Sequence, residues 1–223
     1  MENNPLIIIL LGKSGCGKGT QVNLLVKKYG LDFIGSGDLL RERKKELDFT
    51  GVKISNVIDN GGIVPTPVIF SLWMDKLEEY KKKNIQGLIF DGSPRKILEA
   101  YLIDEALGWY EWDKNIKVIL IDISDDEALK RIELRKVCLN CKAIISNAEE
   151  LNGNIEFCPN CGNKLEKRPD DLQEGVLKRL NWYKAEVEPV VEYYKKDNRL
   201  ITINGEQSIE KVFEDIVRAI EGI

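Results

Sequence analysis

No histidine occurs among the 223 residues of this chain, and the formal net charge is only −4. The absence of an imidazole excludes any mechanism that requires a histidine base. The weak negative charge argues against nonspecific DNA binding as the main task. No apolar run approaches the ~20 residues that span a bilayer, so no membrane partner is expected.

The remaining composition is that of an ordinary folded protein. Hydrophobic residues make up 43% of the chain and charged residues 31%, and the length suits one large domain or one domain with insertions. The first residues, MENNP, carry no basic group before a short apolar run, so no secretory signal is expected and the predicted location is cytoplasmic. A monomer is the default expectation.

A glycine-rich loop follows the first apolar run, Leu6–Leu11, which predicts a buried strand because it has no polar alternation. Gly12, Gly17 and Lys18 meet the pattern G-x-x-x-x-G-K, and the hydroxyl that follows comes at Thr20. Glycines let backbone N–H groups approach phosphate oxygens, and the lysine supplies a mobile positive charge. The helix expected to start near Lys18 directs its positive end at the same anion. A plain turn between strand and helix would not explain the lysine, so the loop predicts phosphate binding.

Two further segments continue the alternation of strands and helices. A short strand ending near Ile34 precedes a helix whose predicted N-cap is Ser36, and residues 35–64 suggest a small helical insertion. The run 87–91 predicts a second buried strand that ends in Asp91, where a phosphate-loop protein places the carboxylate that organises its metal. The turn after it projects the guanidinium of Arg95.

The second half of the chain repeats the alternation. Residues 115–123 predict a third buried strand, and residues 125–136 predict a helix with Arg131 and Arg135 on one face. A long helix from about 172 to 194, a strand at 200–203 and a helix at 208–220 complete the series. The order of elements predicts an α/β fold with three α/β/α layers around a parallel sheet.

Four of the five cysteines form two C-x-x-C pairs separated by sixteen residues: Cys138, Cys141, Cys158 and Cys161. Four thiolates at this spacing complete a tetrahedral zinc site. A redox pair would instead be a single C-x-x-C beside a βαβ unit. Because four protein ligands leave no position for water, the predicted zinc is structural. The fifth cysteine, Cys16, is a small residue of the phosphate loop.

These motifs together resemble the adenylate kinase family over essentially the whole chain. GKSGCGKGTQ resembles its phosphate loop, IGSGDLLR its acceptor segment, DGSPR its DGFPR turn, and RIELRK and RPDD the arginine clusters beside its lid. The resemblance implies reversible transfer of a phosphoryl group from Mg-ATP to AMP, giving two ADP. It also implies a phosphate-loop core at 1–34, 65–136 and 168–223, a nucleoside monophosphate-binding insertion at 35–64, and a zinc-ribbon lid at 137–167.

The resemblance assigns three groups of residues. The donor site would comprise Gly15, Cys16, Gly17, Lys18, Gly19, Thr20, Arg131, Arg135, Ile144, Ile145 and Gln207. The acceptor site would comprise Ser36, Arg41, Gly62, Ile63, Val64, Gly92, Arg95, Glu99, Arg168 and Arg179. The residues at the transferring group would be Lys18, Asp91, Arg95, Arg131, Arg168 and Arg179.

Three positions depart from the family pattern. Ser93 replaces the aromatic residue of the DGFPR turn, Ser36 replaces the usual threonine, and Glu99 replaces a glutamine. An ionised Glu99 can only accept hydrogen bonds, whereas a glutamine can both accept from and donate to adenine. A kinase for another nucleoside monophosphate, either GMP or a pyrimidine nucleotide, is therefore an alternative.

An ATPase whose zinc ribbon binds nucleic acid or a protein partner is the alternative from another class. The ribbon segment, residues 138–161, carries one basic residue, three glutamates and one aromatic residue, Phe157. This composition makes a poor nucleic-acid surface, so no nucleic-acid partner is expected.

Overall fold

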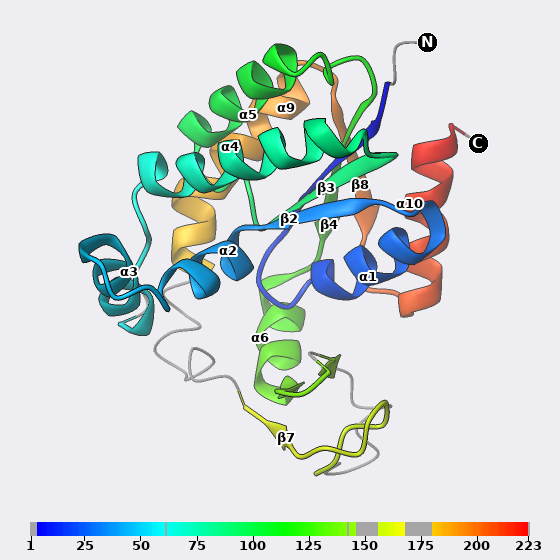
Figure 1. Ribbon diagram of the computed structural model, residues 1–223. Helices are drawn as coiled ribbons and strands as arrows, with labels where there is room; N and C mark the ends of the chain where they lie inside the picture. The colour runs from blue at the N-terminus through cyan, green and yellow to red at the C-terminus, as the bar shows by residue number, and fades with distance from the viewer. Residues whose placement is uncertain (1–3, 61, 142, 146–155, 168–179, 223) are drawn as a thin grey trace.

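The computed structural model describes residues 4–60, 62–141, 143–145, 156–167 and 180–222. Its centre is a parallel sheet of five strands in the order β2-β3-β1-β4-β8 (Figure 1). These strands are β1 (Leu6–Leu11), β2 (Asp32–Gly35), β3 (Gly87–Asp91), β4 (Ile116–Asp122) and β8 (Leu200–Asn204). The predicted α/β fold with a parallel sheet is confirmed.

Helices cover both faces of this sheet, as Figure 1 shows. The described helices are α1 (Lys18–Tyr29), α2 (Ser36–Arg43), α3 (Phe49–Asp59), α4 (Thr66–Lys83), α5 (Ile97–Trp109), α6 (Asp125–Leu134), the π-helical turn η2 (Tyr183–Val187), α9 (Glu188–Lys196) and α10 (Ile209–Glu221). Helices α4, α5 and α9 cover one face, and α1 and α10 cover the other. No described helix combines the length and the apolarity needed to cross a membrane.

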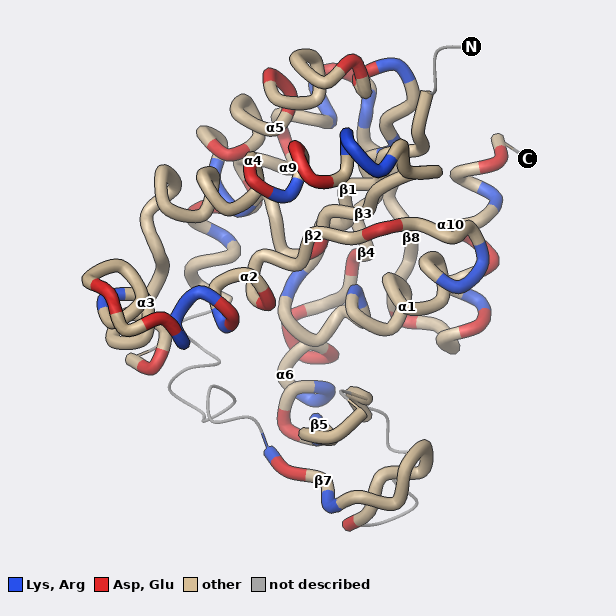
Figure 2. Tube along the Cα trace, viewed as in Figure 1, with Lys and Arg blue, Asp and Glu red and all other residues tan. Residues whose placement is uncertain are grey.

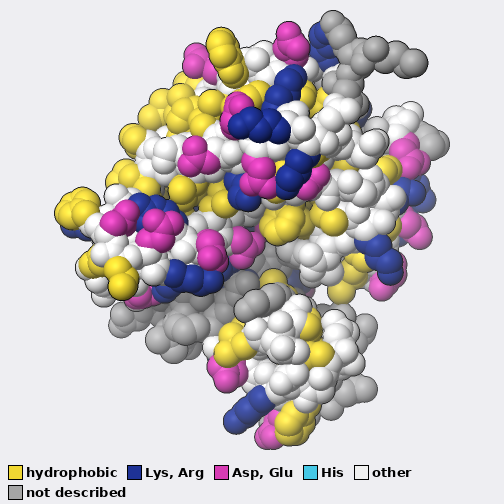
Figure 3. All heavy atoms as spheres, in the orientation of Figure 1, with side chains coloured by type: hydrophobic (Ala, Val, Ile, Leu, Met, Phe, Trp, Pro, Cys, Tyr) yellow, Lys and Arg dark blue, Asp and Glu magenta, His cyan; other side chains and the backbone are white. Residues whose placement is uncertain are grey.

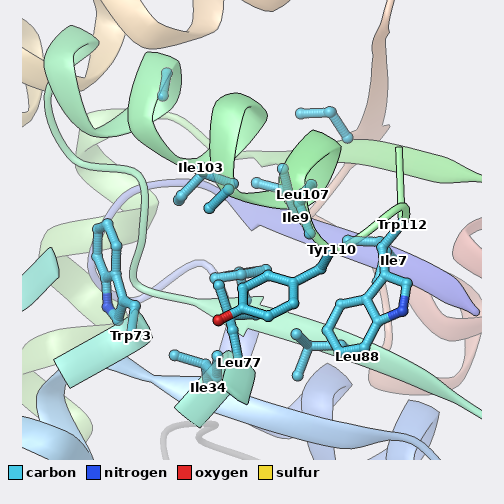
Figure 4. Packing of buried hydrophobic residues seen from close by; sticks show 14 of the residues in the cluster. Ile7, Ile9, Ile34, Trp73, Leu77, Leu88, Ile103, Leu107, Tyr110 and Trp112 are labelled. Carbon is cyan, nitrogen blue, oxygen red and sulfur yellow. The ribbon is translucent and has the colours of Figure 1, made fainter. Parts of the chain in front are cut away.

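Alternate residues of the central strand β1 enter two separate cores. Ile7 and Ile9 pack with α4, α5 and α9, whereas Ile8 and Leu10 pack with α1 and α10. Figure 4 shows the first core, in which Trp73 of α4 lies near the sheet together with other large apolar side chains. A strand buried on both faces needs no polar alternation, which explains its uninterrupted apolar run.

Two smaller parts extend from this core. Helices α2 and α3 lie at one side of the molecule and carry charges of both signs (Figure 2). Ion pairs connect the two helices, including Arg43 with Asp48 at 2.7 Å and Lys44 with Asp59 at 2.9 Å. Apolar side chains are exposed on this helical pair (Figure 3), and Phe49 is one of its exposed apolar residues.

The second small part is an antiparallel sheet below α6, with the strand order β6-β5-β7. Its strands are β5 (Lys136–Cys138), β6 (Ile144–Ile145) and β7 (Leu165–Glu166). The helix predicted at 125–136 ends earlier, at Leu134, because Lys136 already pairs with Ile145. The predicted helix at 172–194 lies partly outside the described residues, but residues 180–196 are helical.

Candidate functional site

The phosphate loop joins β1 to α1 at the carboxyl edge of the sheet, where ligands of open α/β sheets bind. Gly15 and Gly17 have φ values of 87° and 95°, a region that residues with a Cβ rarely adopt. A Cβ on Gly15 would also lie 2.9 Å from the carbonyl oxygen of Ala128 in α6. The loop thus requires glycine for its backbone and for its contact with α6, and α1 begins at Lys18 as predicted.

The side chain of Lys18 folds back over this loop. Its Nζ atom donates hydrogen bonds to the carbonyl oxygens of Gly12 at 2.6 Å and Lys13 at 3.0 Å. It also lies 3.5 Å from the Sγ atom of Cys16, which is buried. The loop therefore holds a positive charge on the carbonyl oxygens of its first two residues, next to the glycines whose N–H groups are expected to bind an anion.

The small antiparallel sheet reaches the start of α1. A Cβ on Gly19 would lie 3.5 Å from the Cδ1 atom of Ile144, so strand β6 lies against the end of the phosphate loop. The neighbouring Ile145 is buried in the cluster that contains Cys138 and Cys158. This contact brings two of the predicted donor residues, Gly19 and Ile144, to the same place.

Arg131 and Gln207 belong to the same edge of the sheet. Arg131 of α6 donates to Glu127 at 2.7 Å and to the carbonyl oxygen of Gly205, after β8, at 3.0 Å. Gln207 donates to the carbonyl oxygen of Asn204 at 2.9 Å. Arg135 follows the end of α6 and is buried.

The DGSPR turn follows β3 beside the phosphate loop. Asp91, the last residue of β3, pairs in register with Leu10, two residues before Gly12. The Nε atom of Arg95 donates to the carbonyl oxygen of Gly92 at 2.7 Å, and its guanidinium lies 5.8 Å from the centre of the Trp182 ring. Asp91, predicted to organise the metal, and Arg95, predicted to bind the phosphoryl group, therefore both lie at the carboxyl edge of the sheet.

Glu99 is 4% exposed and already has protein partners. Its Oε2 atom accepts from the backbone N–H of Arg95 at 2.7 Å, and its Oε1 atom lies 3.5 Å from the hydroxyl of Thr66. Burial raises the pKa of this carboxyl above its usual range, and the Arg95 N–H opposes the shift only in part. The carboxylate that was predicted to contact the acceptor base thus also fixes the backbone of Arg95.

Ser36 does not cap its helix, contrary to the prediction. Gly35 occupies the N-cap position without a side-chain bond, and Ser36 is the first helical residue. The Ser36 hydroxyl instead accepts from the indole Nε1 of Trp73 at 3.1 Å and hydrogen-bonds to the hydroxyl of Ser93. Ser93 is buried, so the serine in place of the family's aromatic residue forms part of a buried polar chain.

The other predicted acceptor residues lie around α2 and the start of α4. Arg41 forms an ion pair with Asp38 at 2.6 Å. The Gly62 N–H donates to the carbonyl oxygen of Val57 at 2.8 Å, and Val64 is buried whereas Ile63 is exposed. Arg168 and Arg179 lie outside the described residues.

The four paired cysteines converge in the small sheet. Their Sγ atoms all lie within 4.8 Å of one another, with Cys138 3.4 Å from Cys161 and Cys141 3.5 Å from Cys158. Backbone bonds shape each pair: Cys138 N–H donates to Ala143 at 2.9 Å, and Cys158 N–H to Asn163 at 2.7 Å. The backbone N–H of Asn163 lowers the pKa of the Cys161 thiol, whereas, against the backbone N–H of Ala143, the other three cysteines raise the pKa of the Cys141 thiol, so the four sulfur atoms lose their protons as one interacting group.

Two residues at the sheet edge were not predicted to have a function. Lys13, within the phosphate loop, forms an ion pair with Asp125 at 2.7 Å. A second cation in the loop was visible in the sequence, but no local pattern identifies its partner. Thr66 was also missed, because its contact with Glu99 joins the starts of two helices that are distant along the chain.

Comparisons with known proteins agree with this geometry. A sequence model of the family described as "Adenylate kinase" matches residues 10–199. The chain is 36% identical to the adenylate kinase of Chlamydia muridarum, over 99% of this chain and 89% of that protein. It is 35% identical to that of Alkaliphilus oremlandii, over 96% and 97% of the two chains. The adenylate kinase of Methanosarcina barkeri is 37% identical to it, over 94% and 95%.

Proposed function

This chain belongs to the adenylate kinase family, and we propose that it transfers a phosphoryl group reversibly from Mg-ATP to AMP, giving two ADP. The observation that carries the proposal is the phosphate loop, which brings Lys18, the glycine N–H groups and Ile144 together at the sheet edge. The proposed donor site is that loop with Arg131, Arg135, Ile144, Ile145 and Gln207.

Positioning and charge neutralisation account for the proposed chemistry. Phosphoryl transfer needs little covalent help from the protein, because the AMP phosphate is already an anionic nucleophile. Lys18, Arg95 and Arg131, together with Arg168 and Arg179, would neutralise the oxygens of the transferring group, which suits the planar fork of arginine. Mg²⁺ would supply further neutralisation of the phosphates, and Asp91 is the residue proposed to hold it.

The acceptor site is proposed to lie beside Arg95. Ser36, Arg41, Gly62, Ile63, Val64, Gly92, Arg95, Glu99, Arg168 and Arg179 would form it. The similarity to proteins named adenylate kinase supports AMP over GMP. The hydrogen bond from the Arg95 N–H occupies one of about four lone-pair sites of the Glu99 carboxylate, so it does not by itself select between adenine and guanine.

The cysteine cluster is proposed to hold structural zinc. Four ligands at a Zn–S distance of about 2.3 Å place sulfur atoms about 3.8 Å apart, and the sulfur distances of 3.4 and 3.5 Å fit this once a metal spreads them slightly. The metal would stabilise a sheet whose buried apolar cluster is small. The lid (137–167) would then close over the donor phosphates and exclude water, which otherwise would hydrolyse ATP.

We further propose that residues 1–34, 65–136 and 168–223 form the core and that residues 35–64 form the acceptor-binding insertion. A cytoplasmic monomer remains our prediction. Gel filtration with light scattering would check the oligomeric state.

A coupled assay of ADP formation tests the proposed function. ATP is supplied with AMP, GMP, CMP or UMP in turn, and we expect the highest kcat/KM with AMP. A higher value with GMP would assign the chain to the alternative substrate. Hydrolysis of ATP that no monophosphate accelerates would instead favour an ATPase.

A further inference from the structure

A carboxylate at the start of α6 joins three segments that are far apart in the sequence. Asp125 is the first residue of α6, which leads into the small cysteine-bearing sheet, and its Oδ1 atom lies 2.7 Å from the Nζ of Lys13 in the phosphate loop. Its Oδ2 atom lies 2.6 Å from the Nζ of Lys184. Lys184 belongs to η2, on the chain's return from the sheet, and a π-helical turn within a helix often marks a functional site.

The two lysines that contact Asp125 differ in exposure to solvent. The Lys13 side chain is 14% exposed and its Nζ also donates to the carbonyl oxygen of Ile123 at 2.8 Å, whereas the Lys184 side chain is 54% exposed. Exposed ion pairs contribute little to the stability of the fold, whereas the attraction between two charges is stronger where they are shielded from water. The Lys13–Asp125 contact is therefore the stronger one, and Lys184 adds to it from the solvent side.

Lys13 also connects Asp125 to the phosphate-binding amine. Its carbonyl oxygen accepts from the Nζ of Lys18 at 3.0 Å, while its own side chain extends away from the loop to Asp125. Asp125 thus contacts the side chain of a residue whose backbone carbonyl oxygen, together with that of Gly12, holds the Lys18 amine. Asp125 itself contacts neither the amine nor the glycine N–H groups that would hold phosphate.

We propose that Asp125 is a positioning residue for the donor phosphates: through Lys13 it holds the phosphate loop, and with Lys184 it couples the loop to the segments that enter and leave the small sheet. The proposal rests on the proposed function only for its kinetic consequences. Its binding consequences require only that the loop takes a nucleoside triphosphate.

Asp125→Asn and Lys13→Met test this proposal, because each removes one charge and keeps most of the side-chain volume. We expect each to raise the KM for ATP and the Kd of the non-hydrolysable imido analogue of ATP about threefold to tenfold, with the KM for AMP unchanged. The double variant should be no worse than the poorer single variant, because either change already breaks the same contact. Lys184→Met should have a smaller effect.

Asp126→Asn is the matched control. It removes a carboxylate from the same first turn of α6, so it has the same effect on the helix dipole, but Asp126 is exposed and makes no ion pair among the described residues. We expect parent-like constants for it. A lower melting temperature of Asp125→Asn with unchanged ATP constants would overturn the proposal and leave Asp125 a merely structural residue. Equal rises in the constants for ATP and AMP, or additive effects in the double variant, would also overturn it.

The binding measurement separates this proposal from the proposed function. If the parent binds the imido analogue but forms no ADP from ATP and AMP, the proposed function fails. A weaker analogue affinity of Asp125→Asn would still support the positioning role in that case.

Discussion

Replacing Glu99 by glutamine should stabilise the folded protein at neutral and alkaline pH. The side chain is 4% exposed, and burial raises the pKa of its carboxyl in the folded state. A neutral glutamine of the same shape avoids the cost of burying a charge. Its carbonyl oxygen can still accept from the Arg95 N–H, and its amide can donate to the hydroxyl of Thr66.

The pH dependence follows from the direction of the shift. Below the unfolded-state pKa of about 4.3, Glu99 is protonated in both the folded and the unfolded parent, so folding buries no charged group at this position. As the pH rises from there through the raised folded-state pKa, the unfolded state loses its proton more readily, so the parent loses stability relative to Glu99→Gln. Because each unit by which the pKa is raised corresponds to about 1.4 kcal/mol, the difference in the free energy of unfolding at pH 8 measures the size of the upward shift, and we expect it to favour Glu99→Gln.

Urea unfolding of both proteins between pH 4 and pH 8 measures this difference. Glu105→Gln is the control, because Glu105 lies on the same helix but is exposed. We expect the control to show no such trend. A Glu99→Gln protein that is less stable than the parent at pH 8 would refute the reasoning, because it would mean that the ionised carboxylate is more stabilised by its contacts than destabilised by burial.

The same variant examines the acceptor site. A glutamine at position 99 can pair with both the amino group and the ring nitrogen of adenine, so kcat/KM for AMP should rise relative to that for GMP. An unchanged ratio would show that residue 99 does not contact the base and acts only on the Arg95 backbone.

Three further outcomes follow from the proposed site. Lys18→Met should lower kcat by orders of magnitude with an unchanged melting curve, and a fully active variant would contradict the role of the loop. Cys158→Ser, or chelation, should lower the melting temperature, and metal analysis should find one zinc per chain; four freely titrating thiols in protein produced with added zinc would exclude the metal site. Replacing Arg95 or Arg179 by lysine keeps the charge but loses the planar fork, so ADP formation should fall sharply and the double variant should be less than additive. Strictly additive effects would place one of the two arginines outside the site.

Features that depend on local patterns were predictable from the sequence. The apolar run of β1, the glycines at positions of positive φ and the two C-x-x-C pairs each lie within a short segment. The structure of each of these segments depends mainly on residues that are neighbours along the chain. For this reason the sheet, the phosphate loop and the cysteine cluster appear where they were predicted.

Features that depend on tertiary contacts were not predictable. Ser36 has the side chain of an N-cap, but its hydroxyl bonds to Trp73 on a different helix and to Ser93 after a different strand. Lys136 continues a helical pattern, yet it pairs with Ile145 in a sheet. In both cases a partner distant in the sequence outweighs the local preference. The contact of Lys13 with Asp125 was missed for the same reason.

The most direct test of the central claim compares two rates on the same protein. One is the formation of ADP from ATP and AMP, and the other is the release of inorganic phosphate from ATP when AMP is absent. A site that uses AMP as the nucleophile and excludes water should give rapid formation of ADP, two molecules for each AMP consumed, and a phosphate release slower by several orders of magnitude. The account would be contradicted if, with or without AMP, one inorganic phosphate were released for each ATP consumed.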